Sequence, residues 1–208
     1  VCTQWENVYN WLADGLNHVT EYIEAQGMTN YIGATVEPKP NEPRGQMFLP
    51  TSGHAVGFIM SRLNKPEFWG VNPELLQHES MCLMNACMTV GYLCSVDKLK
   101  FLHFGSQIKA QFDNDFPPLI GQEGLKETVF MFKALSDIGW KGVVEFDCHM
   151  LRAEGTPEDA YASRRDFIKN CSEALDIALQ LAGRIQKPEK GISQSAADLA
   201  SIRQMCNL

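Results

Sequence analysis

The stretch "YIGATVEPKPNEPRG", residues 31–45, joins an apolar run to a loop in which prolines alternate with charges. The apolar part, 31–37, has the composition of a buried strand. In the loop, each proline fixes its own φ and restricts the residue before it, so Glu37, Lys39 and Glu42 are held in set directions. A strand that ends in oriented charges is typical of a site at one edge of a parallel sheet.

The same order of strand, polar loop and helix recurs along the rest of the chain. Strands are expected at 31–37, 68–72, 100–104 and 142–146, and helices at 6–26, 52–63, 80–94, 124–139 and 156–185. Such alternation predicts a parallel sheet covered by helices, and the continuous apolar runs predict strands that are buried on both faces. Ser52 is expected to cap the second helix, and Thr156 with Asp159 predicts a capping box at the last one.

Composition limits the class of protein. The chain has 208 residues, is 45% hydrophobic and carries a net charge of -7, which is typical of a globular domain and argues against nucleic acid as a partner. No apolar run approaches the ~18 residues of a membrane helix, so no membrane partner is expected. The seven cysteines form no CxxC pair and are expected to be small buried residues of a cytoplasmic protein.

Two segments are expected: one domain over residues 1–187, and a linker with a short helix over 188–208. The chain begins at Val1 without an initiator Met or a signal-peptide pattern, which suggests a processed, truncated or split product.

Carboxylates and imidazoles follow every expected strand. In chain order they are Glu37, Glu74, His78, Glu79, His103, Asp113, Asp115, Asp147 and His149. The carboxyl ends of parallel strands meet at one edge, where grouped carboxylates repel one another unless cations relieve the repulsion. Oxygen ligands with one or two imidazoles suit Mg²⁺, Mn²⁺ or Co²⁺, and the number of candidates suggests two ions.

Each signal taken alone also has an ordinary structural reading. Glu74 and His78 share one face if a helix begins near Leu75, which suits a metal site or a surface pair equally. His103 at a strand end is also consistent with a core histidine. His54 is expected to pack inside its helix, and Asp147 is expected to be partly buried.

Five motifs together resemble the xylose isomerase (glucose isomerase) family, and its short actinobacterial-type subclass in particular. They are "VEPKPNEPRG", "LPTSGHAVGFI", "GVNPE" followed by "HE", "QFDND" and "EFD", and they occur between about residue 5 and about residue 185. The resemblance implies a (β/α) barrel of the TIM type with eight strands, usually a tetramer, which binds two divalent cations. The four βα units here would make half a barrel, completed by another chain or a second copy, or opened into a flat doubly wound sheet.

The resemblance also implies roles for individual residues. The first cation would be held by Glu37, Glu74, His103 and Asp147, and the second by Glu74, His78, Asp113 and Asp115. Lys39 would polarise the carbonyl oxygen of the sugar and act in catalysis with Asp113. His103 stands where the family has an aspartate, which leaves open a shift toward Co²⁺, Mn²⁺ or Zn²⁺ or an empty first site. The Glu42–Pro43 peptide is expected to be cis, as the resemblance implies.

The function implied is a metal-dependent aldose–ketose isomerase that converts D-xylose to D-xylulose, and glucose to fructose, by a metal-assisted hydride shift. Its partner would be a sugar, and the chain would form a homo-oligomer or pair with a missing N-terminal half. An alternative is a catalytically inactive half-barrel with a role in assembly. A third, weaker reading is another enzyme of the same barrel type, such as a sugar epimerase or a metal endonuclease.

Overall fold

The computed structural model describes residues 4–41, 47–118, 124–149 and 155–185. The Glu42–Pro43 peptide and the expected C-terminal segment 188–208 lie outside these residues. The helices are α1 (Trp5–Ala25), α2 (Ser52–Arg62), α3 (His78–Met81), α4 (Ala86–Ser95), α5 (Gly124–Ile138) and α6 (Pro157–Arg184). The strands are β1 (Ala34–Val36), β2 (Trp69–Val71), β3 (Phe101–Phe104) and β4 (Val143–Phe146).

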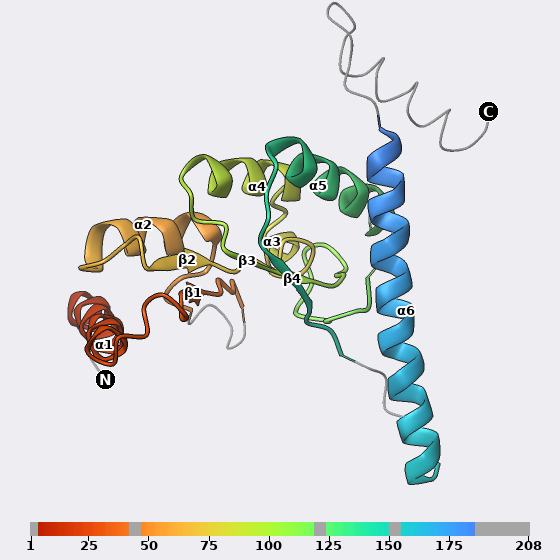
Figure 1. Cartoon of the computed structure of the whole chain (residues 1–208), viewed down its shortest axis with the longest axis horizontal. Coiled ribbons are helices and arrows are strands. Elements are labelled where there is room, and N and C mark those ends of the chain that lie inside the picture. Colours follow the sequence, from red (N-terminus) through yellow and green to blue (C-terminus); the bar gives the residue numbers. More distant parts are fainter. Residues whose placement is uncertain (1–3, 42–46, 119–123, 150–154, 186–208) are drawn as a thin grey trace, which may run out of the picture.

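The four strands run parallel and follow one another in chain order (Figure 1). Strand β1 pairs with β2, and β3 pairs with β4 so that His103 lies opposite Glu145. Parallel bridges from Val71 to Leu99 and from Glu74 to His103 connect the β2 and β3 segments. The predicted parallel βα arrangement is therefore confirmed, and all strand ends that carry acids reach the same edge.

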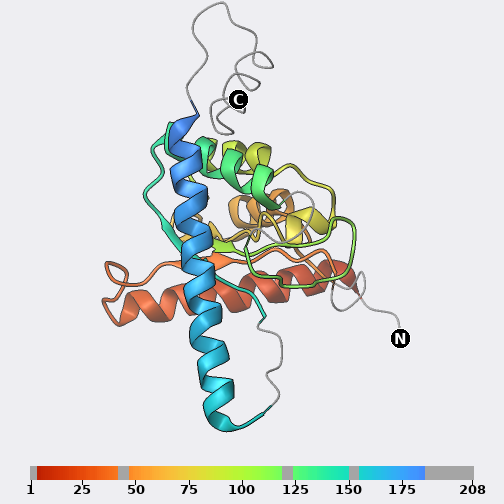
Figure 2. The same cartoon turned by 90° about the vertical axis from the view of Figure 1, so that its right-hand side faces the viewer.

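The hydrophobic core lies between the strands and the helices α2, α4 and α5, with α6 standing beside α5 (Figures 1 and 2). Leu102 and Phe104 of β3 are fully buried. The ring of Phe104 meets that of Phe132 on α5 edge to face, with centroids 5.2 Å apart. Alternate residues of β3 therefore anchor the sheet to the helices, and the residue between them, His103, faces the other side.

Burial on both faces of every strand was expected, and this is wrong for β4. Strand β2 is buried throughout, but Val143 of β4 is 59% exposed and Glu145 is exposed as well. Val144 and Phe146, which alternate with them, pack against the core. The described helices cover one face of this strand, so its side chains alternate between the core and the open face.

The single helix expected over 80–94 is also wrong, because the chain forms α3 and α4 with a break between them. Leu83 in the break has a φ of 58°, which a continuing right-handed helix does not allow. Asn85 then caps α4, because its side-chain oxygen accepts a hydrogen bond from Met88 N at 3.1 Å.

The caps of two other helices test the predictions made from their sequences. The cap of α2 is Thr51 rather than Ser52, since Thr51 Oγ1 accepts from His54 N at 3.4 Å. Ser52 is instead buried and its hydroxyl donates to Glu79 at 2.5 Å. His54 is exposed, so its expected packing role is wrong. The capping box of α6 is confirmed, with reciprocal bonds between Thr156 and Asp159.

Helix α6 is long, and its first half projects beyond the rest of the domain (Figures 1 and 2). Tyr161 and Ile168 in that half are 71% and 61% exposed. The buried residues of α6 are Cys171, Ala174, Ala178 and Ala182. Cys171 thus fits the expectation of buried thiols, whereas Cys82 is exposed and contradicts it. No helix in the described part of the chain is long and apolar enough to cross a membrane.

Candidate metal site

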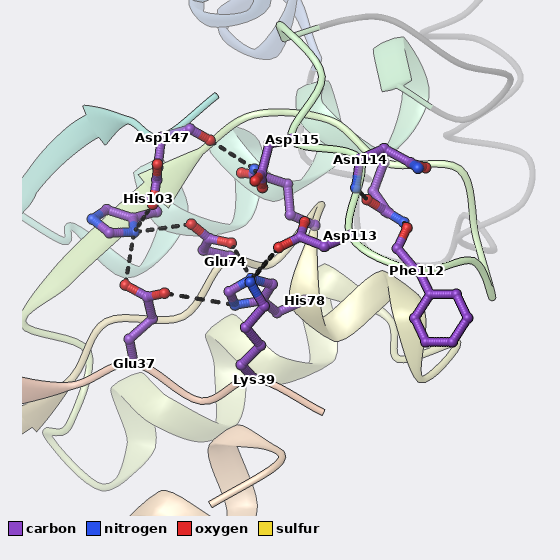
Figure 3. A network of polar contacts seen from close by, with 12 residues as sticks. Glu37, Lys39, Glu74, His78, His103, Phe112, Asp113, Asn114, Asp115 and Asp147 are labelled. Carbon is purple, nitrogen blue, oxygen red and sulfur yellow. Dashed lines mark hydrogen bonds and ion pairs between the residues drawn. The ribbon is translucent and has the colours of Figure 1, made fainter. Parts of the chain in front are cut away.

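Four side chains from four strand ends form a first group of candidate ligands (Figure 3). They are Glu37, Glu74, His103 and Asp147, each offering one ligand atom within 4.8 Å of the others. Nδ1 of His103 lies at the centre, 3.1 Å from a Glu37 oxygen, 3.0 Å from Glu74 Oε1 and 3.1 Å from an Asp147 oxygen. Each carboxylate thus turns an oxygen toward one common point.

The sheet explains why these residues meet. Glu37 directly follows β1, and Asp147 directly follows β4. Glu74 is bridged to His103, so the two side chains leave neighbouring backbone positions. Because parallel strands end at the same edge, residues that are more than a hundred positions apart in the sequence become neighbours.

A second group consists of Glu74, His78 and Asp115, whose ligand atoms also lie within 4.8 Å of one another. Nε2 of His78 is 2.7 Å from Glu74 Oε2. Nδ1 of the same ring lies 3.0 Å from the Pro38 carbonyl, which can only accept, so Nδ1 carries a hydrogen and Nε2 faces the acids. The condition for a shared helix face, a helix that begins near Leu75, is not met, because α3 begins at His78 itself. The buried loop before α3 nevertheless places the pair in contact.

Lys39 and Asp113 form an ion pair beside the second group. The Asp113 oxygen that accepts from Lys39 also lies 3.4 Å from His78 Nε2. Asp113 is therefore shared between a lysine and a candidate ligand. Asp115, its neighbour two positions on, supplies the carboxylate of the second group.

Gln77 connects the two groups and was not singled out from the sequence. Its side chain is fully buried, and its amide donates to Asp115 Oδ1 at 2.9 Å and to the Asp147 carbonyl at 2.7 Å. A Cβ at Gly105 would lie 2.4 Å from Gln77 Oε1, so glycine is needed there for the amide to fit. A glutamine in an acidic loop carries no pattern that distinguishes it from an exposed one.

The groups shift one another's protonation. Burial opposes ionisation of Glu74, but hydrogen bonds from His103 and His78 outweigh burial and lower the pKa of Glu74 to about 2. Burial disfavours a charged His78, yet Asp113 and Glu74 raise the pKa of His78 to about 9. For His103, Glu37 and Glu74 likewise overcome burial and raise the pKa to about 10. The site therefore holds both histidines as cations among its carboxylates.

The remaining carboxylates divide in two directions. Burial and the adjoining Asp113 raise the pKa of Asp115 to about 6. A hydrogen bond with Glu74, together with burial, raises the pKa of Asp147 to about 6. Asp113 behaves oppositely, because its bonds with His78, Asp115 and Lys39 outweigh burial and keep its pKa below the usual range. Asp115 and Asp147 are thus protonated more readily than isolated aspartates, because other carboxylates crowd them.

These residues fit divalent cations. Asp113 Oδ1 is a buried oxygen that accepts no hydrogen bond from any described residue. A buried anionic oxygen without a donor is costly, and a cation removes that cost. Carboxylate oxygens with one imidazole in each group are the donors that Mg²⁺, Mn²⁺ and Co²⁺ accept.

Comparison with known proteins identifies the family. No family model matches the chain. The chain is 37% identical over 147 residues to the xylose isomerase of Thermus thermophilus, a match that covers 71% of this chain and 36% of that protein. Xylose isomerase from Streptomyces lividans is 36% identical over 134 residues, covering 64% of this chain and 32% of that one. The chain thus spans about a third of the length of these curated relatives.

Solved structures show the same fold. An L-ribulose 3-epimerase superposes with a TM-score of 0.58 at 17% identity, over 91% of this chain and 61% of that one. D-Psicose 3-epimerase from Clostridium cellulolyticum H10 gives a TM-score of 0.54 at 18% identity, over 88% of this chain and 58% of that chain. Both are TIM-barrel proteins, which agrees with a partial parallel βα fold. On its sequence similarity to the curated relatives, the chain belongs to the xylose isomerase family.

Proposed function

We propose that this chain carries the cation-binding edge of an aldose–ketose isomerase, which interconverts D-xylose and D-xylulose and also glucose and fructose. The observation that carries the proposal is the pair of ligand groups that share Glu74. A shared carboxylate lets two cations lie close to one substrate. The curated relatives are named xylose isomerase, which supports the choice of an aldose as substrate.

Two divalent cations would be held by the two groups. The first would lie among Glu37, Glu74, His103 and Asp147, and the second among Glu74, His78 and Asp115, with Asp113 beside it. When bound, such cations act as Lewis acids toward sugar oxygens. Because His103 adds a nitrogen donor to the first group, we favour Mn²⁺ or Co²⁺ over Mg²⁺ there.

Lys39 would act on the carbonyl oxygen of the open-chain sugar. Its ammonium pairs with Asp113, which limits the directions that the side chain can take. A fixed positive charge stabilises the negative charge that develops on the carbonyl oxygen as the hydrogen moves to the carbonyl carbon with its electron pair. Lys39 is 21% exposed, so a substrate can still reach it.

Asp113 would accept a hydrogen bond from the hydroxyl group whose proton has to leave before the hydride can move, and its lowered pKa leaves the proton itself to a water molecule beside the second cation. Its Oδ2 is occupied by Lys39 and His78, but Oδ1 receives no hydrogen bond from the described residues. The hydroxyl oxygen then becomes the new carbonyl oxygen, and the proton returns to the former carbonyl oxygen at the end. The same carboxylate thus orients both Lys39 and the reacting hydroxyl group.

The barrel would be completed by further parallel strands, from a second copy, another chain or a longer form of this one. The open face of β4 supports this, because Val143 and Glu145 project from it into solvent. Parallel sheets are ordinarily covered on both faces. Light scattering of the purified chain would give the assembly mass and distinguish a monomer from a homo-oligomer.

Titration calorimetry with Mn²⁺ and Co²⁺ tests the metal site without requiring a complete barrel. We expect binding to the chain and a strong loss in Glu37→Gln and Asp147→Asn. Glu145→Gln, the same chemical change on an exposed carboxylate two positions from Asp147, is expected to leave binding intact. Absence of Mn²⁺ and Co²⁺ binding in the wild-type chain would overturn the proposed function.

Product analysis then tests the reaction. The completed assembly is incubated with D-xylose and Mn²⁺, and NMR identifies the sugars formed. D-Xylulose supports the isomerase. An epimerised ketose made from a ketose substrate would favour an epimerase, and metal binding without any turnover would favour the inactive assembly role.

A further inference from the structure

Cys148 and Cys171 bring their sulfur atoms to 3.8 Å although they are 23 positions apart in the sequence. Cys148 follows the end of β4, and Cys171 lies on the buried face of α6 with 1% of its surface exposed. Both are free thiols. The two thiols thus touch where the segment after β4 meets α6.

The backbone on either side of Cys148 is tied to the candidate metal site. Asp147 O accepts from Gln77, and His149 N donates to the Asp115 carbonyl at 2.7 Å. The side chain between them turns the other way, toward α6. The Cys148 thiol therefore takes no part in the ligand groups, and its place beside Cys171 needs a separate explanation.

We propose that Cys148 and Cys171 form an oxidisable dithiol that small-molecule disulfides convert to a disulfide bond between β4 and α6. The sulfurs have to close by about 1.8 Å to reach the ~2.05 Å of an S–S bond. Strand β4 ends at Phe146, so Cys148 lies in irregular backbone that can follow this movement. The proposal does not depend on the isomerase function.

The oxidation balances as two exchange steps. The Cys148 sulfur attacks one sulfur of the small disulfide, forms a mixed disulfide and releases one small thiol. The Cys171 sulfur then attacks the Cys148 sulfur, forms the internal bond and releases the second small thiol. The protein loses two hydrogens and two electrons, and the small disulfide takes them up. Cys148 reacts first because it is half-buried, whereas Cys171 is closed to reagents.

The disulfide would tether α6 at Cys171, where the packed half of the helix begins. In the first half, Tyr161 and Ile168 are largely exposed, and packing begins at Cys171. A link at Cys171 closes the chain segment between β4 and α6 and reduces the freedom of the unfolded state. Oxidation is therefore expected to raise the midpoint of thermal unfolding by about 5–10 °C.

The experiment incubates the full chain with oxidised glutathione at about pH 8, blocks remaining thiols and maps tryptic peptides by mass spectrometry. Burial and the neighbouring Cys171 raise the pKa of the Cys148 thiol to about 12, so samples are followed over many hours. We expect residues 142–152 and 170–184 to appear as one disulfide-linked pair. In the native chain the link should be specific to this pair, whereas in urea, where the two cysteines are not held together, both should also appear in disulfides with other cysteines.

Two variants separate the two steps. Cys171→Ser should accumulate the glutathione adduct on Cys148, and Cys148→Ser should leave Cys171 unmodified. Cys94→Ser, which changes another partly buried thiol, should still form the link. Failure of the linked peptide to appear in the native chain, or its formation there in no greater share of all disulfide-linked peptides than in urea, would overturn the proposal.

Discussion

Oε1 of Glu74 lies 3.0 Å from Nδ1 of His103, while the other oxygen of the same carboxylate turns toward His78. One fully buried acid thereby belongs to both ligand groups. Its two oxygens are not interchangeable, because each faces a different histidine. Loss of this single charge is therefore expected to affect both groups, unlike loss of Glu37 or Asp147.

The first prediction concerns that shared acid. Glu74→Gln should abolish both Mn²⁺ binding events in titration calorimetry. The loss of Mn²⁺ affinity should exceed the roughly 10–100-fold that follows when a residue bonded to a ligand, and not the ligand itself, is removed. Asp147→Asn should weaken only the event assigned to the first group. Equal losses in the two variants would contradict a shared ligand, and Glu145→Gln provides the control for an acid-to-amide change.

The second prediction separates Lys39 from metal binding. Lys39→Met should lower kcat of the completed assembly by about 10²–10³-fold, as loss of one oxyanion donor does, and leave the stoichiometry of Mn²⁺ unchanged. Lys100→Met, which removes an exposed lysine paired with Asp97, should have little effect on turnover. Steady-state kinetics with D-xylose and a parallel metal titration distinguish a catalytic loss from a collapsed site.

The third prediction is a pH dependence of metal affinity. The pKa values of His78 and His103 are raised to about 9 and about 10, so both rings are cations at pH 7 in the metal-free chain. A metal ion has to displace those protons, and its affinity should rise with pH by about tenfold per pH unit for each proton displaced, until pH reaches about 9. Calorimetry in buffers of different ionisation enthalpy counts the protons released.

The fourth prediction is that the same two histidines make the free energy of unfolding of the metal-free chain depend on pH. Their pKa values are higher in the folded than in the unfolded chain, so their contribution to the free energy of unfolding is fully present below about pH 6.5. It should be lost as pH rises through about 9 to 10. Urea denaturation of the metal-free chain across this pH range measures the loss. A free energy of unfolding that rises with pH there would contradict the prediction.

The fifth prediction concerns a buried hydrogen bond in the core. Trp69 Nε1 donates to Thr20 Oγ1 at 2.9 Å, and both side chains are buried. Thr20→Val keeps the shape but leaves the indole N–H without an acceptor, which should lower the free energy of unfolding by about 1–3 kcal/mol. Thr20→Ser retains the hydroxyl and should cost less in the same urea titration. Equal losses would assign the effect to packing.

The order of strands and helices was readable from the sequence because each element repeats a clear apolar pattern. The helix expected over 124–139 was placed correctly, because Gly139, with a φ of 78°, follows the end of α5 directly. The candidate ligands could be named from their positions after strands, since the parallel register brings those positions together. The sequence pattern therefore predicts which residues reach the carboxyl edge of the strands.

The local structure around these residues could not be predicted, because it depends on backbone geometry that residue types alone do not determine. An apolar run such as 80–94 gives no sign that Leu83 will adopt a positive φ and break the helix. Glu74 and His78 meet across a buried loop rather than along a helix face, although their spacing suited a helix. The open face of β4 was missed because an apolar strand has the same composition whether one or both faces are covered.

Gln77 has a consequence for any attempt to alter this protein. Its amide spans from the Asp115 side chain to the Asp147 backbone, and thereby sets how far apart the β3 loop and the β4 end are held. The backbone hydrogen bond from His149 N to the Asp115 carbonyl holds the same two segments together. An engineer who wished to tune the distance between two bound ions would have to redesign a neutral side chain and the glycine beneath it, leaving every ligand untouched.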